Sequence, residues 1–290
     1  MGQTPTSPEQ DIDETEARAQ STLTDVQGHI VGSRKTVSAI VPVFDEETTI
    51  KKVVEALLAS NLIDEVICVN DGSSDDSLAI LVTFGELITL IDLKQNQGKG
   101  NALATGIREA QCEIVAFFDA DLANLSDRHI NTLLDPILNG KACAVLGYPT
   151  KESTRSTVFG NLTGERAYYR HDLLPLLAEM ETTRFGIEVL LNETFREPAP
   201  MKVALTGLRG LYKYEKYPPA KAMREYMGEV TEIAQEIGRR EGLLSEDRQI
   251  IAELKEVMDL DALKIRIAKI RNASIRQYLE EYVLRYFNRA

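Results

Sequence analysis

Short apolar runs alternate with helix-like stretches through the first half of the chain. Runs rich in β-forming residues occupy 37–44, 65–70, 87–93, 114–118 and 142–147. Each run is long enough for a buried strand and too short for a helix. The stretches between them, such as 45–58 and 127–139, carry apolar residues at helical spacing. Strands and helices that alternate in this way predict an α/β fold with a Rossmann-like, doubly wound and mostly parallel sheet.

The two ends of the chain have different patterns. Residues 1–35 are mostly Ser, Thr, Gln, Asp and Glu, which predicts a disordered polar arm. Residues 36–218 would form the α/β domain, and residues 219–290 have helical spacing, which predicts a C-terminal helical extension. Its last part, a predicted helix over 262–287, interleaves apolar and basic residues, so it packs on its own domain or a homodimer partner, or makes peripheral contact with an anionic membrane.

Charge and composition narrow the function classes. The formal net charge of −12 argues against a nucleic-acid partner, because binding to phosphate backbones needs a basic face. No apolar run reaches the roughly 20 residues of a membrane span, and the amino terminus lacks a signal-peptide core. The three cysteines, Cys68, Cys112 and Cys143, lie in or beside strand-like runs without metal-ligand spacing, so we expect core positions in a reducing compartment. A cytoplasmic protein is therefore expected.

Two aspartates directly follow the apolar run 114–118. Asp119 and Asp121 occupy alternate positions, so in an extended chain their side chains share one face at the carboxyl end of a buried strand. Ligands bind at that edge of open α/β sheets. Paired carboxylates there suit a hard cation such as Mg²⁺ or Mn²⁺ that also binds phosphate oxygens. The alternative is that an aspartate only caps the next helix.

Other strand ends carry polar groups in chain order. Asp71 and Ser73 follow the second run, where an acid can accept from a base or ribose, although D-G-S is also an ordinary turn. Asn96 to Gly100 presents backbone N–H groups and Lys99 at a helix start, which suits an anion but lacks the P-loop spacing. Glu46, after the first run, is either a site residue or a helix cap.

Four of these segments together resemble a known family. P-V-F-D-E-E, V-N-D-G-S-S-D, N-Q-G-K-G-N-A-L and F-D-A-D-L, within residues 37–125, are similar to the nucleotide-sugar half of family 2 glycosyltransferases. The resemblance implies a GT-A fold and a bound nucleoside diphosphate. The implied nucleotide-binding residues are Pro42, Phe44, Glu46, Asp71, Ser73, Lys99, Asp119 and Ala120. Asp119 and Asp121 match the family's D-x-D, with Asp121 as the direct metal ligand.

The part of the chain after residue 125 resembles the family less firmly. Arg155 and Arg166 lie in a polar, basic stretch and are candidates for binding an acceptor anion, or are ordinary arginines of a surface loop. Gly164 offers a turn beside the expected sugar site. Glu188 lies in an apolar helix-like run, where a carboxylate is costly unless it is paired or functional. It resembles an acid near the acceptor in polyprenyl-phosphate glycosyltransferases and glucosyl-phosphoglycerate synthases, or it is simply paired with Arg184.

A strand and loop follow Met201. In the relatives this loop closes over the donor, and in the phosphoglycerate enzymes it supplies a histidine to the metal. Here Arg209, Tyr212 and Lys213 occupy the region, which leaves the third metal ligand open.

The leading hypothesis is a metal-dependent glycosyltransferase that moves a hexose from a nucleotide-sugar, such as UDP-glucose, to a small phosphorylated acceptor, a polyprenyl phosphate or a hydroxyl group. The alternatives are a sugar-phosphate nucleotidyltransferase, whose glycine-rich first-strand signature is missing here, and a nucleotide-sugar-binding protein without turnover.

Overall fold

The computed structural model describes residues 23–24, 30–31, 34–150, 162–257 and 259–287. The chain divides into two compact units, 1–35 and 36–290. In the first unit, the two-residue strands β1 (Leu23–Thr24) and β2 (Ile30–Val31) pair antiparallel, which the sequence did not predict. Apart from Arg34 and Lys35, the rest of the expected polar arm lies outside the described residues.

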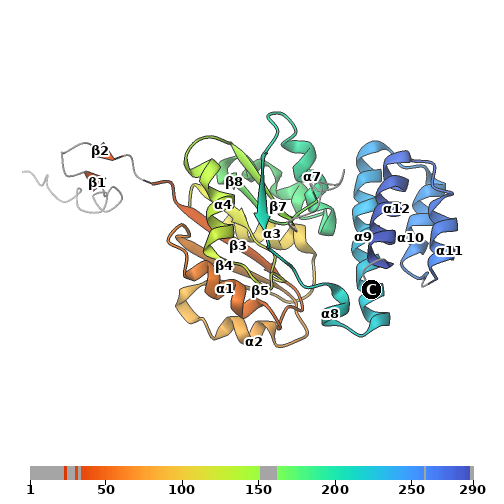
Figure 1. The fold of residues 1–290 in the computed structure, drawn as a ribbon, viewed down its shortest axis with the longest axis horizontal. Coiled ribbons are helices and arrows are strands. Elements are labelled where there is room, and N and C mark those ends of the chain that lie inside the picture. Colours follow the sequence, from red (N-terminus) through yellow and green to blue (C-terminus); the bar gives the residue numbers. More distant parts are fainter. Residues whose placement is uncertain (1–22, 25–29, 32–33, 151–161, 258, 288–290) are drawn as a thin grey trace, which may run out of the picture. The chain divides into compact units, whose positions relative to one another are not determined.

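Seven strands form the sheet of the second unit, in the order β5-β4-β3-β6-β8-β7-β9 (Figure 1). Strands β5, β4, β3 and β6 are parallel, and so are β7 and β9, whereas β8 runs antiparallel between β6 and β7. The strands are β3 (Val37–Val43), β4 (Glu65–Asp71), β5 (Thr89–Leu93), β6 (Ile114–Phe117), β7 (Ala144–Thr150), β8 (Arg166–Tyr169) and β9 (Met201–Thr206). This mixed, mostly parallel sheet confirms the predicted fold class. Strand β8 falls where the sequence indicated only a polar loop.

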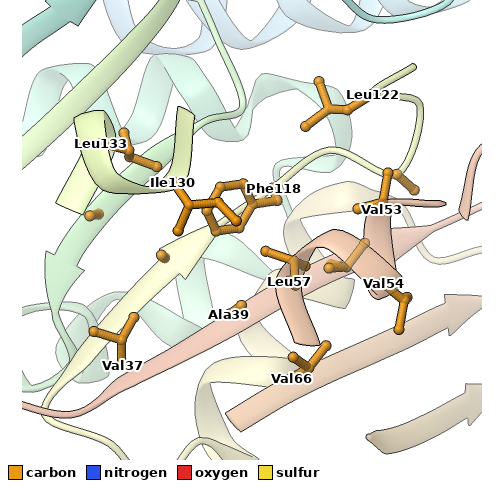
Figure 2. Close-up of a cluster of buried hydrophobic side chains, with 14 of the residues drawn as sticks. Val37, Ala39, Val53, Val54, Leu57, Val66, Phe118, Leu122, Ile130 and Leu133 are labelled. Atoms are coloured by element: carbon orange, nitrogen blue, oxygen red, sulfur yellow. The ribbon is translucent and has the colours of Figure 1, made fainter. Parts of the chain in front are cut away.

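Helices cover both faces of the sheet and create two hydrophobic cores. Successive residues of β3 point to opposite faces, so Ala39 joins the core beneath α1 and α4, while Ile40 joins the core beneath α3 and α7. Figure 2 shows Leu57 of α1 and Ile130 of α4 in the first core, near Phe118. The helices of this part are α1 (Ile50–Leu58), α2 (Ser77–Val82), η1 (Gly85–Leu87), α3 (Lys99–Glu109), α4 (Asp127–Leu138), α5 (Arg170–Leu173), η2 (Leu174–Leu176), α6 (Leu177–Met180), η3 (Arg184–Gly186), α7 (Ile187–Thr194) and α8 (Lys213–Lys216).

Four further helices build a third core in the same compact unit (Figure 1). They are α9 (Pro219–Glu241), α10 (Ser245–Leu254), α11 (Leu260–Ile267) and α12 (Ala273–Phe287). Helix α9 starts with a proline at its first position and ends before Gly242, whose φ of 85° favours glycine. The prediction of one helix over 262–287 was wrong, because 268–272 separate α11 from α12.

Several apolar side chains of the last helices are buried inside the protein, although Ile265 of α11 is 60% exposed. Ile267, Ile270, Ile275 and Leu279 are at most 2% exposed and belong to the third core. They therefore pack on their own compact unit, which confirms that alternative for the C-terminal residues. Among the described residues, no helix combines the length and the apolar character that crossing a membrane requires.

The cysteine prediction holds only in part. Cys68 is buried in β4, but Cys112 is half-buried and Cys143 is exposed, so a core position was wrong for Cys143. Cys143 precedes β7 in the short connection after α4, where the chain turns at the surface.

Candidate active site

The candidate site lies at the carboxyl edge of the parallel strands. Asp71 is the last residue of β4, and Asp119 and Asp121 follow β6. Strand β3 pairs with β4 on one side and β6 on the other, so the strand order reverses here. Open α/β sheets bind ligands at such switch points, because the connecting loops diverge and leave a crevice.

Asp71 holds the glycine-rich turn that precedes α3. Its Oδ1 accepts from the backbone N–H of Gln97, and its Oδ2 accepts from that of Gly98, both at 2.7 Å. Burial raises the pKa of Asp71, and these two backbone hydrogen bonds oppose that effect. Gly98 has a φ of 96°, and a Cβ there would lie 2.8 Å from Cγ of Arg184. The sequence suggested a base or ribose contact for Asp71, whereas both oxygens already fix the turn that carries Lys99.

Lys99 links two of the predicted site residues. Its Nζ lies 2.7 Å from Oδ1 of Asp119 and 2.7 Å from Oε1 of Glu188. Burial alone would lower the pKa of Lys99, but the two carboxylates outweigh burial and raise it. The alternative pairing of Glu188 with Arg184 was wrong, because Arg184 pairs with Glu232 of α9 instead.

Asp119 is enclosed by a segment that the sequence only hinted at. A Cβ on Gly164 would lie 2.2 Å from Oδ2 of Asp119, so only glycine leaves room for the carboxylate. The neighbouring Glu165 is 3% exposed and accepts a hydrogen bond of 2.5 Å from Oγ1 of Thr163. Burial, followed by the negative charge of Asp119, raises the pKa of Glu165 to about 8. Nothing in the sequence pattern identified Glu165 as part of the site.

Glu46 and Asp121 share a lysine that the sequence did not identify. Nζ of Lys216, in α8, lies 2.6 and 2.7 Å from the two carboxylate oxygens of Glu46 and 3.4 Å from Oδ2 of Asp121. The Lys216 side chain is only 5% exposed. Burial raises the pKa of Glu46 to about 7, while Lys216 lowers it and Asp121 raises it further.

The segment after β9 is held in place from both sides. Nζ of Lys213 lies 2.6 Å from Oε1 of Glu229 in α9, and Arg209 pairs with Glu215 at 2.8 Å. The backbone N–H of Leu211 donates to the carbonyl of Asp121 at 2.9 Å. The residues that occupy this loop, Arg209, Tyr212 and Lys213, are therefore engaged in ion pairs or backbone contacts.

The remaining residues that the sequence predicted to bind the nucleotide differ in burial and in their contacts. Phe44 is 39% exposed beside Glu46, and Pro42 lies half-buried near the end of β3. Oγ of Ser73 accepts from the backbone N–H of Asp45 at 3.1 Å. Ala120 is 3% exposed and its side chain belongs to the first core.

The two predicted acceptor arginines have different outcomes. Arg155 lies outside the described residues. Arg166 is not in a surface loop: it begins β8 and is 1% exposed. Its guanidinium donates to the carbonyl of Thr163 at 2.7 Å and to Oδ1 of Asn192 at 2.9 Å. These contacts tie the buried guanidinium to the 163–165 segment and to α7, and the acceptor-binding role of Arg166 stays a prediction.

The donor atoms at this edge suit a hard cation that also contacts phosphate. Asp119 and Asp121 offer carboxylate oxygens on side chains that are 29% and 31% exposed. Within the part of the chain that the structure describes, no three His, Cys, Asp or Glu side chains form a metal-binding group. A divalent ion would therefore complete its shell with ligand oxygens and water, as Mg²⁺ commonly does with phosphates.

Comparisons with known proteins agree with this fold. The model of the glycosyl transferase family 2 matches residues 38–189, which contain the strand-end motifs, Glu165 and Glu188. This chain belongs to the glycosyl transferase family 2. The family match confirms the resemblance drawn from the four sequence motifs.

Curated relatives match over part of their length. A glucosyl-3-phosphoglycerate synthase of Mycolicibacterium paratuberculosis is 33% identical over 113 residues, which are 37% of this chain and 34% of that enzyme. A poly-beta-1,6-N-acetyl-D-glucosamine synthase of Staphylococcus epidermidis is 31% identical over 129 residues, which are 43% of this chain and 31% of that enzyme. The chain therefore spans about a third of the length of these relatives.

A solved structure supports the fold. The glucosyl-3-phosphoglycerate synthase of Mycobacterium tuberculosis, in complex with Mn²⁺, uridine diphosphate and phosphoglyceric acid, has a TM-score of 0.56 and 24% identity. The similarity covers 73% of this chain and 80% of that chain. At this identity the similarity establishes the shared fold only.

Proposed function

We propose that this chain is a metal-dependent glycosyltransferase that moves a hexose from a nucleotide-sugar of the UDP-glucose kind to a phosphorylated or hydroxyl acceptor. The observation that carries the proposal is the pair Asp119 and Asp121 at the switch point of the sheet, with Lys99 against Asp119. Family membership supports the transfer reaction. The Mn²⁺, UDP and phosphoglyceric acid named for the structural relative support the donor and acceptor class.

The donor side uses fixed charges. Asp119 and Asp121 would hold Mg²⁺ or Mn²⁺, and the ion supplies positive charge that stabilises the departing diphosphate. Lys99, at the first turn of α3, adds an ammonium whose position is set by two carboxylates before substrate arrives. Preorganised charges of this kind stabilise a leaving group without further reorganisation. Phe44 offers an exposed ring next to Glu46 for contact with the nucleobase of the donor.

The acceptor side centres on Glu188. Lys99 neutralises this carboxylate at 2.7 Å, which fits an orienting role better than a proton-accepting one. A phosphate acceptor needs no strong base, because its oxygen is already ionised. A hydroxyl acceptor would require Glu188 to take the proton of the hydroxyl group. The ion pair between Lys99 and Glu188 would first have to open.

The test is a donor and acceptor panel with purified protein. We expect hexose transfer from UDP-glucose to 3-phosphoglycerate or another phosphorylated acceptor in the presence of Mg²⁺ or Mn²⁺, and none in EDTA. Asp121→Ala should abolish metal-dependent binding of the donor while the protein stays folded. Full transfer in EDTA, or unchanged donor affinity in Asp121→Ala, would refute the metal assignment. Release of pyrophosphate from a nucleoside triphosphate and a sugar phosphate would indicate a nucleotidyltransferase instead.

A further inference from the structure

Lys216 is a buried site cation that none of the strand-end motifs accounts for. Its ammonium lies between Glu46, which follows β3, and Asp121, the second acid of D-x-D. With the side chain 5% exposed, little water is available to this charge, so the two carboxylates are its main compensation. The inference below rests on the proposed metal-dependent function.

The contacts of Lys216 are unequal. The distances to the two Glu46 oxygens are 2.6 and 2.7 Å, whereas the distance to Asp121 is 3.4 Å. Asp121 is therefore the partner that Lys216 can give up while keeping a bidentate contact. Lys99 differs, because it contacts Asp119 and Glu188 equally at 2.7 Å.

A divalent cation and the Lys216 ammonium would compete for the same carboxylate. Two positive charges a few ångströms apart repel strongly in a partly buried site. A nucleoside diphosphate brings negative charge that compensates the additional cation, so the repulsion matters most when the metal ion arrives alone. The local geometry therefore couples metal binding to nucleotide binding.

We propose that Lys216 competes with the divalent cation for Asp121, and that the metal ion and nucleotide together displace the lysine from Asp121, so that it keeps only its contact with Glu46. Lys216 thereby lowers the affinity of the site for the free ion and makes the ion bind with the diphosphate. The backbone of α8 need not move for this exchange, because Lys213 anchors the same helix to Glu229 at 2.6 Å. Lys216 is thus a positioning residue for the metal site.

The experiment titrates Mn²⁺ into the full chain, with and without UDP, and follows the electron paramagnetic resonance signal of free Mn²⁺. Lys216→Met should bind Mn²⁺ alone about tenfold tighter than the wild type, because a repelling charge is gone. The difference in Mn²⁺ affinity between Lys216→Met and the wild type should be smaller when UDP is present. Lys221→Met is the matched control: it removes a lysine of α9 that lies 4.1 Å from the ring centre of Tyr217, and it should bind Mn²⁺ like the wild type.

A second variant protects the test against misfolding. Lys216→Met leaves Glu46 without its partner, so the double variant Glu46→Gln/Lys216→Met replaces the ion pair with neutral groups and should show the same tighter Mn²⁺ binding. Unchanged Mn²⁺ affinity in both variants, with binding still lost in Asp121→Ala, would overturn the role of Lys216 and leave the proposed function intact. No Mn²⁺ binding by the wild type even with UDP would overturn both.

Discussion

The two sides of the candidate site are held together in different ways. On the nucleotide side, Asp71 and Ser73 bind backbone N–H groups of adjoining strand-end turns. On the other side, carboxylates meet lysines that are distant in the chain: Lys99 and Glu188 are 89 positions apart, and Glu46 and Lys216 are 170 apart. The first side is a scaffold fixed by turn geometry, whereas the second is a charge network that depends on the packing of the C-terminal half. We therefore expect substitutions in the scaffold to change the geometry of the site, and substitutions in the charge network to change its electrostatic balance.

The largest effect is expected at Gly164, which lies directly against the carboxylate of Asp119. Gly164→Ala would place a methyl group at the 2.2 Å position beside Asp119 and force this carboxylate to move. Displacing a site group by about 1 Å can cost roughly a hundredfold in reaction rate, and because Asp119 is a proposed metal ligand we expect metal-dependent UDP binding to weaken as well. Titration calorimetry with UDP and Mn²⁺ measures the change.

Gly228→Ala is the control for this substitution. Gly228 lies in α9, and apart from the adjoining backbone of its own helix no atom lies within 4 Å of a Cβ built there, so the protein should bind UDP normally and gain up to about 1 kcal/mol of stability. Normal UDP affinity in Gly164→Ala would contradict the close approach of the 163–165 segment to Asp119.

A smaller, pH-dependent effect is expected from Glu165. Its pKa is raised from 4.5 to about 8 in the folded protein, so the folded state holds this proton more tightly than the unfolded state. The stabilisation from this group is complete below pH 4.5 and is lost as the pH rises toward 8. Glu165→Gln has no carboxyl group to ionise, so the variant should not show this loss. Between pH 4.5 and 8, the decrease in its free energy of unfolding should be about 2 to 4 kcal/mol smaller than the decrease in the wild type.

Urea unfolding of both proteins at several pH values checks this expectation. The amide of Glu165→Gln can still accept from Thr163, which makes the variant a near-isosteric control for packing. If wild type and variant lose stability in parallel as the pH rises, Glu165 is not the buried acid that the geometry indicates.

The sequence predicted the nucleotide side well because its signals are local. Each predicted strand from 37 to 147 corresponds to an observed strand within a few residues, and the strand-end residues Asp71 and Asp119 lie at one edge of the sheet as expected. An apolar run fixes where a buried strand ends, and the parallel order places those ends together. Neither step requires knowledge of distant contacts.

The other side could not be predicted because its partners come from tertiary packing. Lys216 is one of several charged residues in K-Y-E-K-Y, and only the fold brings it to Glu46. Arg166 lies in a polar, basic stretch whose composition is typical of a surface loop, yet the antiparallel pairing of β8 with β6 and β7 buries this residue. Glu165 has no periodic or motif signal, and its importance comes from the burial that β8 imposes.

A crystal structure of the protein soaked with Mn²⁺ and UDP, with data collected at the manganese absorption edge, tests whether Asp119 and Asp121 bind the metal ion. The account predicts an anomalous difference peak at the carboxylates of Asp119 and Asp121, next to the diphosphate, and Lys216 withdrawn from Asp121. A diphosphate bound at this edge without an anomalous peak at the two aspartates, or a peak elsewhere, would contradict it.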